Sequence, residues 1–120
     1  MRIFHIPAYT DNYIWVMQSG SDISVIDPGD ASPIIDIIKN NDLNLVDILL
    51  THHHFDHVGG TLELKKQLNG KVYGPIGDIK GVDIHVSEND KVKTLGYEFA
   101  ILETPGHTLD HLSLIHISEP

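Results

Sequence analysis

Cysteine, basic residues and long apolar runs are scarce or missing in this sequence. With no cysteine among 120 residues, neither disulfides nor thiolate metal ligands are available, which suits a reducing compartment. Eight Lys and Arg against seventeen Asp and Glu give a formal net charge of −9, which argues against nucleic acid as a partner because phosphate binding needs a clustered basic surface. No apolar run approaches the roughly 20 residues that cross a bilayer, and the N-terminus lacks a signal-peptide pattern. We therefore expect a cytoplasmic protein with no membrane partner.

Short runs rich in β-branched and aromatic residues alternate along the chain with amphipathic runs. Ser32 as N-cap and Pro33 at the first helical position open a helix that reaches about Asn40. A second helix follows Gly59-Gly60, where two glycines allow the backbone to turn sharply. The alternation of strands and helices predicts one α/β layered domain. The expected strands span 2–6, 13–18, 22–27, 46–50, 71–73, 83–86, 91–94 and 97–103.

Groups that titrate or bind metal are most concentrated in Thr51-His52-His53-His54-Phe55-Asp56-His57, directly after the apolar run 46–50. Imidazole nitrogen and carboxylate oxygen are ligands that suit a borderline divalent ion such as zinc. In an extended segment alternate side chains point the same way, so His52 and His54 project together. They leave the carboxyl end of a central strand, where α/β proteins commonly place their sites. Asp56 and His57 follow and could reach a second ion.

A second feature, Thr104-Pro105-Gly106-His107-Thr108, follows another expected strand. Its Pro-Gly turn presents His107. A lone histidine after a turn is usually just exposed, and the plain alternative for the whole cluster is a solvated histidine-rich turn. His107 weakens that alternative because it completes a three-imidazole set with His52 and His54. Three ligands are the number of a catalytic zinc that leaves a position for water.

Other polar residues near these motifs have less specific explanations. Asp27 ends a strand in Asp27-Pro28-Gly29-Asp30, and a turn-forming role is at least as favoured as direct metal ligation. The functional alternative for Asp27 is that its side chain orients a metal-bound histidine. His53 and Phe55 face away from the predicted ligands and fit packing or support of a ligand. The remaining histidines have no partner visible in the sequence and are interpreted as structural: His5, His85 and His116.

These motifs resemble a known family. T-H-H-H-F-D-H fits the T-H-x-H-x-D-H signature of the metallo-β-lactamase fold superfamily, and T-P-G-H-T fits its next ligand motif. Within that superfamily the likeness to bacterial glyoxalase II, the hydroxyacylglutathione hydrolases, runs from Arg2 to about His111. It implies a partial metallo-β-lactamase-like αββα sandwich, mainly the N-terminal half. The segments that select this member are 6–9, 11–15, 26–31 and 72–75.

The resemblance implies a binuclear metal site in a thioester hydrolase. His52, His54 and His107 would hold one ion, and Asp56 and His57 the other. Zinc is the usual metal, two per complete site, with iron or manganese tolerated. A hydroxide held between the metals would attack the thioester of S-D-lactoylglutathione, releasing D-lactate and glutathione in methylglyoxal detoxification. The implied partner is thus a small glutathione thioester, and the full-length enzyme is expected to be a monomer.

The family pattern also continues beyond this chain. Relatives have a further strand ending in a G-D-T-L-F-like motif whose aspartate bridges both metals, a later histidine ligand, and a helical region that grips glutathione. We therefore expect the 120-residue polypeptide to be inactive or nearly so. Alternatives that share the histidine motif are a persulfide dioxygenase, a lactonase, and a non-catalytic metal-binding fragment. A β-lactam substrate is least favoured, because the glyoxalase-like segments have no reason to accompany it.

The last nine residues, LSLIHISEP, suggest a separate origin. The DNA string CTG TCT CTT ATA CAC ATC TCC GAG CCC translates to these letters and resembles the transposase adapter of shotgun sequencing libraries. We expect residues 1–111 to be the N-terminal part of a metallo-β-lactamase-like domain, and 112–120 to be a non-native tail from adapter read-through. The alternative is a natural apolar strand over 112–117.

Overall fold

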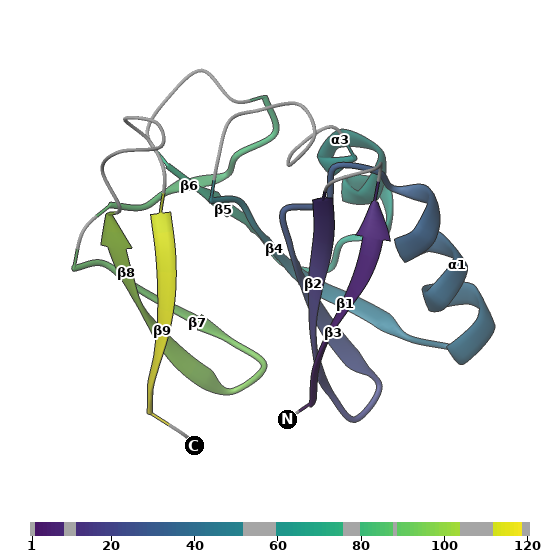
Figure 1. The fold of residues 1–120 in the computed structure, drawn as a ribbon, viewed down its shortest axis with the longest axis horizontal. Helices are drawn as coiled ribbons and strands as arrows, with labels where there is room; N and C mark the ends of the chain where they lie inside the picture. The colour runs from purple at the N-terminus through teal and green to yellow at the C-terminus, as the bar shows by residue number, and fades with distance from the viewer. Residues whose placement is uncertain are drawn as a thin grey trace.

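Two β-sheets face each other in the computed structural model, and two helices lie on the outer side of the larger sheet (Figure 1). The structure describes residues 2–8, 12–51, 60–75, 80–87, 89–103 and 112–118. In these residues, sheet A has the order β1-β2-β3-β4-β5-β6 and sheet B has the order β7-β8-β9. The elements are β1 (Arg2–Ala8), β2 (Asn12–Ser19), β3 (Asp22–Ile26), α1 (Ser32–Asn41), β4 (Asn44–Leu49), α3 (Thr61–Leu64), the 3₁₀ turn η1 (Lys65–Gln67), β5 (Val72–Gly74), β6 (Ile84–His85), β7 (Lys91–Thr94), β8 (Tyr97–Glu103) and β9 (Leu112–Ser118).

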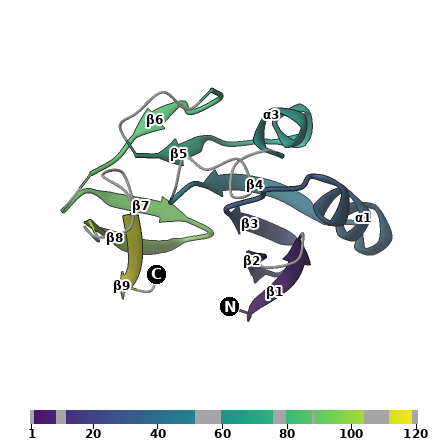
Figure 2. The ribbon, with the colours of Figure 1, turned by 45° about the horizontal axis from the view of Figure 1, so that its top comes forward.

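Sheet A changes from antiparallel to parallel pairing at β3. Strands β1, β2 and β3 form an antiparallel meander, whereas β3, β4, β5 and β6 pair in parallel. Parallel neighbours need crossover connections, and the segments with α1 and α3 provide two of them. Figure 2 shows both helices on one side of sheet A and sheet B on the other. This confirms the predicted α/β layers of a partial sandwich. No helix in the described ranges is long and apolar enough to cross a membrane.

Two apolar layers follow from the alternation of side chains along the strands of sheet A. On β2, Ile14 and Val16 face the helices while Met17 faces sheet B. On β4, Ile48 and Leu49 divide in the same way, so this strand is covered on both faces, as its continuous apolar run predicts. The helix-side core comprises Ile14, Val16, Ile23, Val25, Ala31, Ile34, Leu45, Ile48, Leu50, Leu64 and Val72. The inter-sheet core comprises Met17, Leu49, Val86, Val92, Phe99 and Ile101.

Both helices begin or end differently from the sequence expectation. Ser32 is the first residue of α1 and Ala31 is its N-cap, so the predicted capping role of Ser32 is wrong. The carboxylate of Asp30 instead accepts a hydrogen bond from the Ser32 N–H at 3.0 Å. The sequence predicts that the second helix is closed by Asn69-Gly70, whereas α3 is only four residues long and continues as η1. Tertiary contacts of Lys65, whose ammonium donates to Gly81 O at 3.0 Å, accompany this change of helix type.

The chain over 112–118 forms strand β9, which pairs antiparallel with β8. The backbone of this segment therefore agrees with the alternative of a strand over 112–117. Pairing does not reveal the origin of the segment, so adapter read-through stays a prediction.

Apolar and aromatic side chains remain uncovered at the β1 edge of sheet A. Ile3, Tyr13 and Trp15 are 57%, 51% and 44% exposed. His5 lies between the two aromatic rings, with centroid distances of 4.7 Å to Tyr13 and 5.0 Å to Trp15. These contacts support the structural interpretation of His5.

Candidate metal centre

The predicted metal ligands lie outside the described residues. His52, His54, Asp56 and His57 fall in 52–59, and His107 falls in 104–111. The structure describes the strands that deliver both segments: β4 ends at Leu49 and β8 at Glu103. Figure 1 shows β4, β5 and β8 ending towards the same, upper side of the molecule. Within the described ranges, no group of three or more His, Cys, Asp or Glu is placed to hold a metal.

Asp27 fixes the residue that directly precedes the histidine cluster. Its backbone N–H donates to Leu49 O at 2.9 Å, and its φ of 54° lies in the left-handed region that Asp tolerates better than most residues. One carboxylate oxygen accepts the Thr51 N–H at 2.7 Å, and the other accepts the Thr51 hydroxyl. Because Asp27 is buried, these charge-assisted hydrogen bonds form with little competition from water. The start of the cluster is thereby fixed to the end of β3.

Gly60 fixes the far end of the same segment. Its N–H donates to Pro28 O at 2.8 Å. A Cβ at this position would lie 2.6 Å from Ala31 N and 2.7 Å from Pro28 O, closer than real Cβ atoms approach backbone. The φ of Gly60 is −88°, so glycine is required here for close approach and not for a special backbone conformation. Gly59 lies outside the described residues, so the expected sharp turn at Gly59-Gly60 stays a prediction.

Thr51 and Gly60, the described residues on either side of 52–59, thus both contact the turn Asp27-Pro28-Gly29-Asp30. We call residues 27–30 the cradle. The carboxylate of Asp27 reaches Thr51, 24 positions away. Its hydrogen bonds therefore extend beyond the local turn-forming role weighed from the sequence. Whether Asp27 also orients a metal-bound histidine stays a prediction, as do the ligand assignments.

Mainly apolar side chains line a small cavity at the end of β4. A small cavity between the sheets is lined by Thr51 on one side and by Val92 and Ile101 of sheet B on the other. Tyr73 also lines it, and burial raises the pKa of this phenol above its usual range, with the charge of Asp47 adding to the effect. The cavity lining beside Thr51 is thus mainly apolar.

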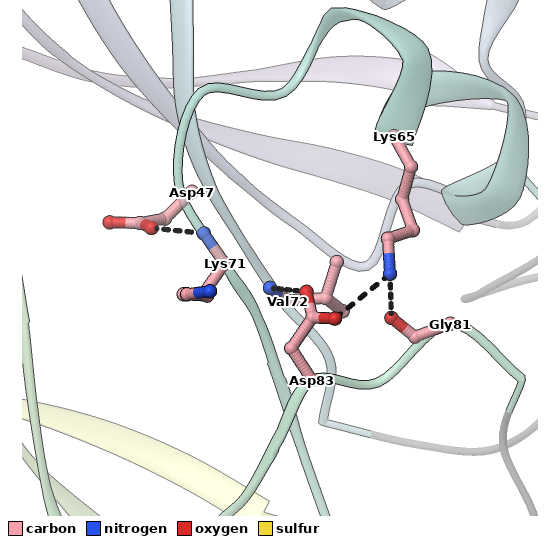
Figure 3. A network of polar contacts seen from close by, with 6 residues as sticks. All are labelled: Asp47, Lys65, Lys71, Val72, Gly81 and Asp83. Atoms are coloured by element: carbon pink, nitrogen blue, oxygen red, sulfur yellow. Dashed lines mark hydrogen bonds and ion pairs between the residues drawn. The ribbon is translucent and has the colours of Figure 1, made fainter.

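A second polar network holds the loop beside β5 and β6 (Figure 3). Asp83 accepts the Val72 N–H at 3.0 Å and forms an ion pair with Lys65 at 3.0 Å. These two contacts lower the pKa of Asp83, the backbone hydrogen bond most. Lys65 also binds Gly81 O, so η1, β5 and the start of β6 are joined through a lysine and a carboxylate that the sequence did not single out. His85 is close by, with Nδ1 3.2 Å from Pro75 O, which agrees with a structural role.

Comparisons with known proteins agree with this fold. Residues 10–81 match the family described as the metallo-beta-lactamase superfamily. The hydroxyacylglutathione hydrolases of Pseudomonas fluorescens and Pseudomonas syringae are 46% and 45% identical to the chain, each over 97% of its length. These matches cover 47% and 46% of the two relatives, so the chain spans about half the length of the curated relatives it matches.

Among solved structures, ETHE1 from Myxococcus xanthus superposes with a TM-score of 0.82 at 23% identity. The match covers 97% of this chain and 54% of that one, and at this identity it shows a shared fold alone. The family match covers more than half of the sequence and includes the cradle, Thr51 and Gly60. The chain therefore belongs to the metallo-beta-lactamase superfamily.

Proposed function

We propose that this chain is the metal-binding N-terminal part of a hydroxyacylglutathione hydrolase. The complete protein would hydrolyse S-D-lactoylglutathione to glutathione and D-lactate, in the detoxification of methylglyoxal. The observation that carries the proposal is that Thr51 and Gly60, which flank the H-x-H-x-D-H sequence, are both hydrogen-bonded to the cradle. The identity of 46% to a hydroxyacylglutathione hydrolase over nearly the whole chain supports this activity over others of the superfamily.

The donor set fits a divalent metal. Three imidazoles from two segments, His52, His54 and His107, would hold one ion, and Asp56 with His57 would hold a second. Zinc suits these nitrogen and oxygen donors best, two ions per complete site, with iron or manganese compatible. The bound ions would supply a nucleophile from water at neutral pH and neutralise charge on the thioester oxygen.

The described residues contribute positioning and exclusion of water. Asp27 and Thr51 set the direction in which the chain leaves β4, and Gly60 sets where it returns. Metal sites depend on such support, because ligands that are free to move lose affinity. The apolar lining of the cavity beside Thr51 would limit the access of water where β4 ends.

Because the chain spans about half of its relatives, the activity is proposed for the whole protein. The 120-residue polypeptide alone is proposed to bind metal through the three histidines and to be inactive or nearly so. A cytoplasmic location and a monomeric full-length enzyme complete the proposal.

The test is thioester hydrolysis by the complete reading frame loaded with zinc, followed as release of the glutathione thiol. Oxygen uptake with glutathione persulfide, and hydrolysis of a penicillin, should be assayed in parallel. We expect thiol release that is abolished by His54→Ala and retained in His5→Ala, a matched change of an exposed histidine on β1. Oxygen uptake without thiol release would instead identify a persulfide dioxygenase and overturn the proposal.

A further inference from the structure

A chain of buried polar groups crosses from sheet A to sheet B. The Oγ of Ser24 lies 2.6 Å from the Oγ1 of Thr94, and the Thr94 hydroxyl donates to Asp47 Oδ2 at 2.7 Å. Because the single hydroxyl hydrogen of Thr94 points at Asp47, Ser24 must be the donor to Thr94. All three residues are buried. The result is a directed chain, Ser24 to Thr94 to Asp47, which we call the inter-sheet lock.

The lock depends on local features of sheet A. The β3–β4 register shifts between Ile23 and Ser24, and this shift places Ser24 opposite Asp47. The second carboxylate oxygen of Asp47 accepts the Lys71 N–H at 2.9 Å (Figure 3). Gly70 leaves room for that carboxylate, because a Cβ there would collide with Asp47 Oδ1. Asp47 is therefore fixed by β5 before it receives the hydroxyl of Thr94.

We propose that the inter-sheet lock is a positioning device that sets how sheet B sits on sheet A, and thereby the separation of the two metal-ligand segments. This rests on the proposed function, because it takes His52, His54 and His107 as ligands. The apolar contacts between the sheets, such as Leu49 with Ile101, are non-directional and tolerate small sliding or tilting. The lock is directional, and its displacement would take the Thr94 donor away from one oxygen, Oδ2, of the buried Asp47 carboxylate.

A small tilt of sheet B at the lock would produce a larger displacement at the far end of β8. Thr94 pairs with Tyr97 at the first residue of β8, whereas the segment with His107 follows the last, Glu103. Six residue steps along a strand span about 20 Å, so a tilt of roughly 10° about the lock would move that end by roughly 3 Å. Metal–ligand distances tolerate only about 0.2 Å. A small change of orientation at Thr94 would therefore change the distances between the proposed ligands and the metal.

Thr94→Val tests this proposal, since it removes the hydroxyl and keeps the shape of the side chain. Thr94→Ser keeps the hydroxyl and is the conservative rescue. Val92→Ala, in the same interface, is the control for lost packing. As the chain has no cysteine, spin labels on Lys39→Cys of α1 and on Lys91→Cys, at the end of β7 away from Thr94, report the distance between the two layers without competing sites. Calorimetric titration with zinc reports metal affinity.

We expect Thr94→Val to shift or broaden the inter-layer distance and to weaken zinc binding by about tenfold or more. Thr94→Ser should restore both values, and Val92→Ala should leave both unchanged even where it lowers the denaturation midpoint.

If Thr94→Val does not fold, Ser24→Ala removes only the outer hydroxyl and should give a smaller shift in the same direction. An unchanged distance in the folded Thr94 and Ser24 variants, or an equal change in Val92→Ala, would overturn the lock. If the parent chain binds no zinc, the metal binding proposed for this chain fails, while the distance measurement still decides the positioning claim.

Discussion

Replacing Gly60 by alanine tests the attachment of the histidine segment to the cradle. The new methyl group would lie 2.6 Å from Ala31 N, 2.7 Å from Pro28 O and 2.9 Å from Asp30 C. All three are backbone atoms, which cannot rotate away as a side chain can. Either the cradle shifts or the 52–59 segment lifts, and the hydrogen bond from Gly60 N to Pro28 O is then strained or lost.

The magnitude follows from three contributions. Overpacking against rigid neighbours costs about 1–3 kcal/mol. The weakened hydrogen bond adds about 1 kcal/mol. Alanine offsets about 0.4–1 kcal/mol by restricting the unfolded chain, because the φ of −88° suits any residue. We expect a net loss of about 2 kcal/mol in the free energy of unfolding.

The assay is equilibrium unfolding in urea with metal-free protein, and Gly74→Ala is the matched control. The nearest atom to a Cβ at Gly74 is a Val82 methyl at 3.0 Å, which can move, so this change should cost clearly less. For slopes of about 1–2 kcal/mol per molar urea, Gly60→Ala should lower the midpoint by roughly 1–2 M. Equal midpoints for Gly60→Ala and the parent chain would refute the close approach of this glycine to the cradle.

Further predictions concern buried and charged groups near the site. Thr61→Val should leave the urea midpoint unchanged or raise it, by up to about 1 kcal/mol in unfolding free energy, because the buried hydroxyl has no partner among the described residues; a clear loss would show that the hydroxyl is satisfied. The Val72 N–H and the Lys65 ammonium lower the pKa of Asp83, so its stabilising effect is present above its usual pKa and is lost as the pH falls through the lowered value. The gap in Tm between the parent and Asp83→Asn should therefore narrow in acid, and a gap independent of pH would contradict this. Burial raises the pKa of Tyr73, so the parent should lose Tm as the pH rises above about 10, and Tyr73→Phe should lose less; parallel curves would count against the burial of this phenol.

Local patterns were sufficient for the strands from β1 to β8. The apolar run 46–50 predicts a strand covered on both faces, and β4 occupies Asn44–Leu49 and is covered on both faces. The α/β layering follows from the same alternation. In each case the signal lies within a few consecutive residues, where side-chain period and turn chemistry act directly.

Contacts between distant residues could not be predicted in this way. Asp27 and Thr51 are 24 positions apart, and Ser24 and Thr94 are 70 positions apart. Ser24 carries no distinguishing signal of its own, because its role depends on a register shift in the β3–β4 pairing. The requirement for glycine at residue 60 also comes from backbone that only the folded chain brings near.

Zinc titration of the 120-residue chain by calorimetry tests the central claim most directly. We expect saturable binding in the parent chain and in His5→Ala, and its loss in His54→Ala, because only the latter removes a member of the proposed ligand set. Binding that is absent from the parent, or that survives His54→Ala undiminished, would contradict the assignment of 52–59 as the metal-binding segment of this fold.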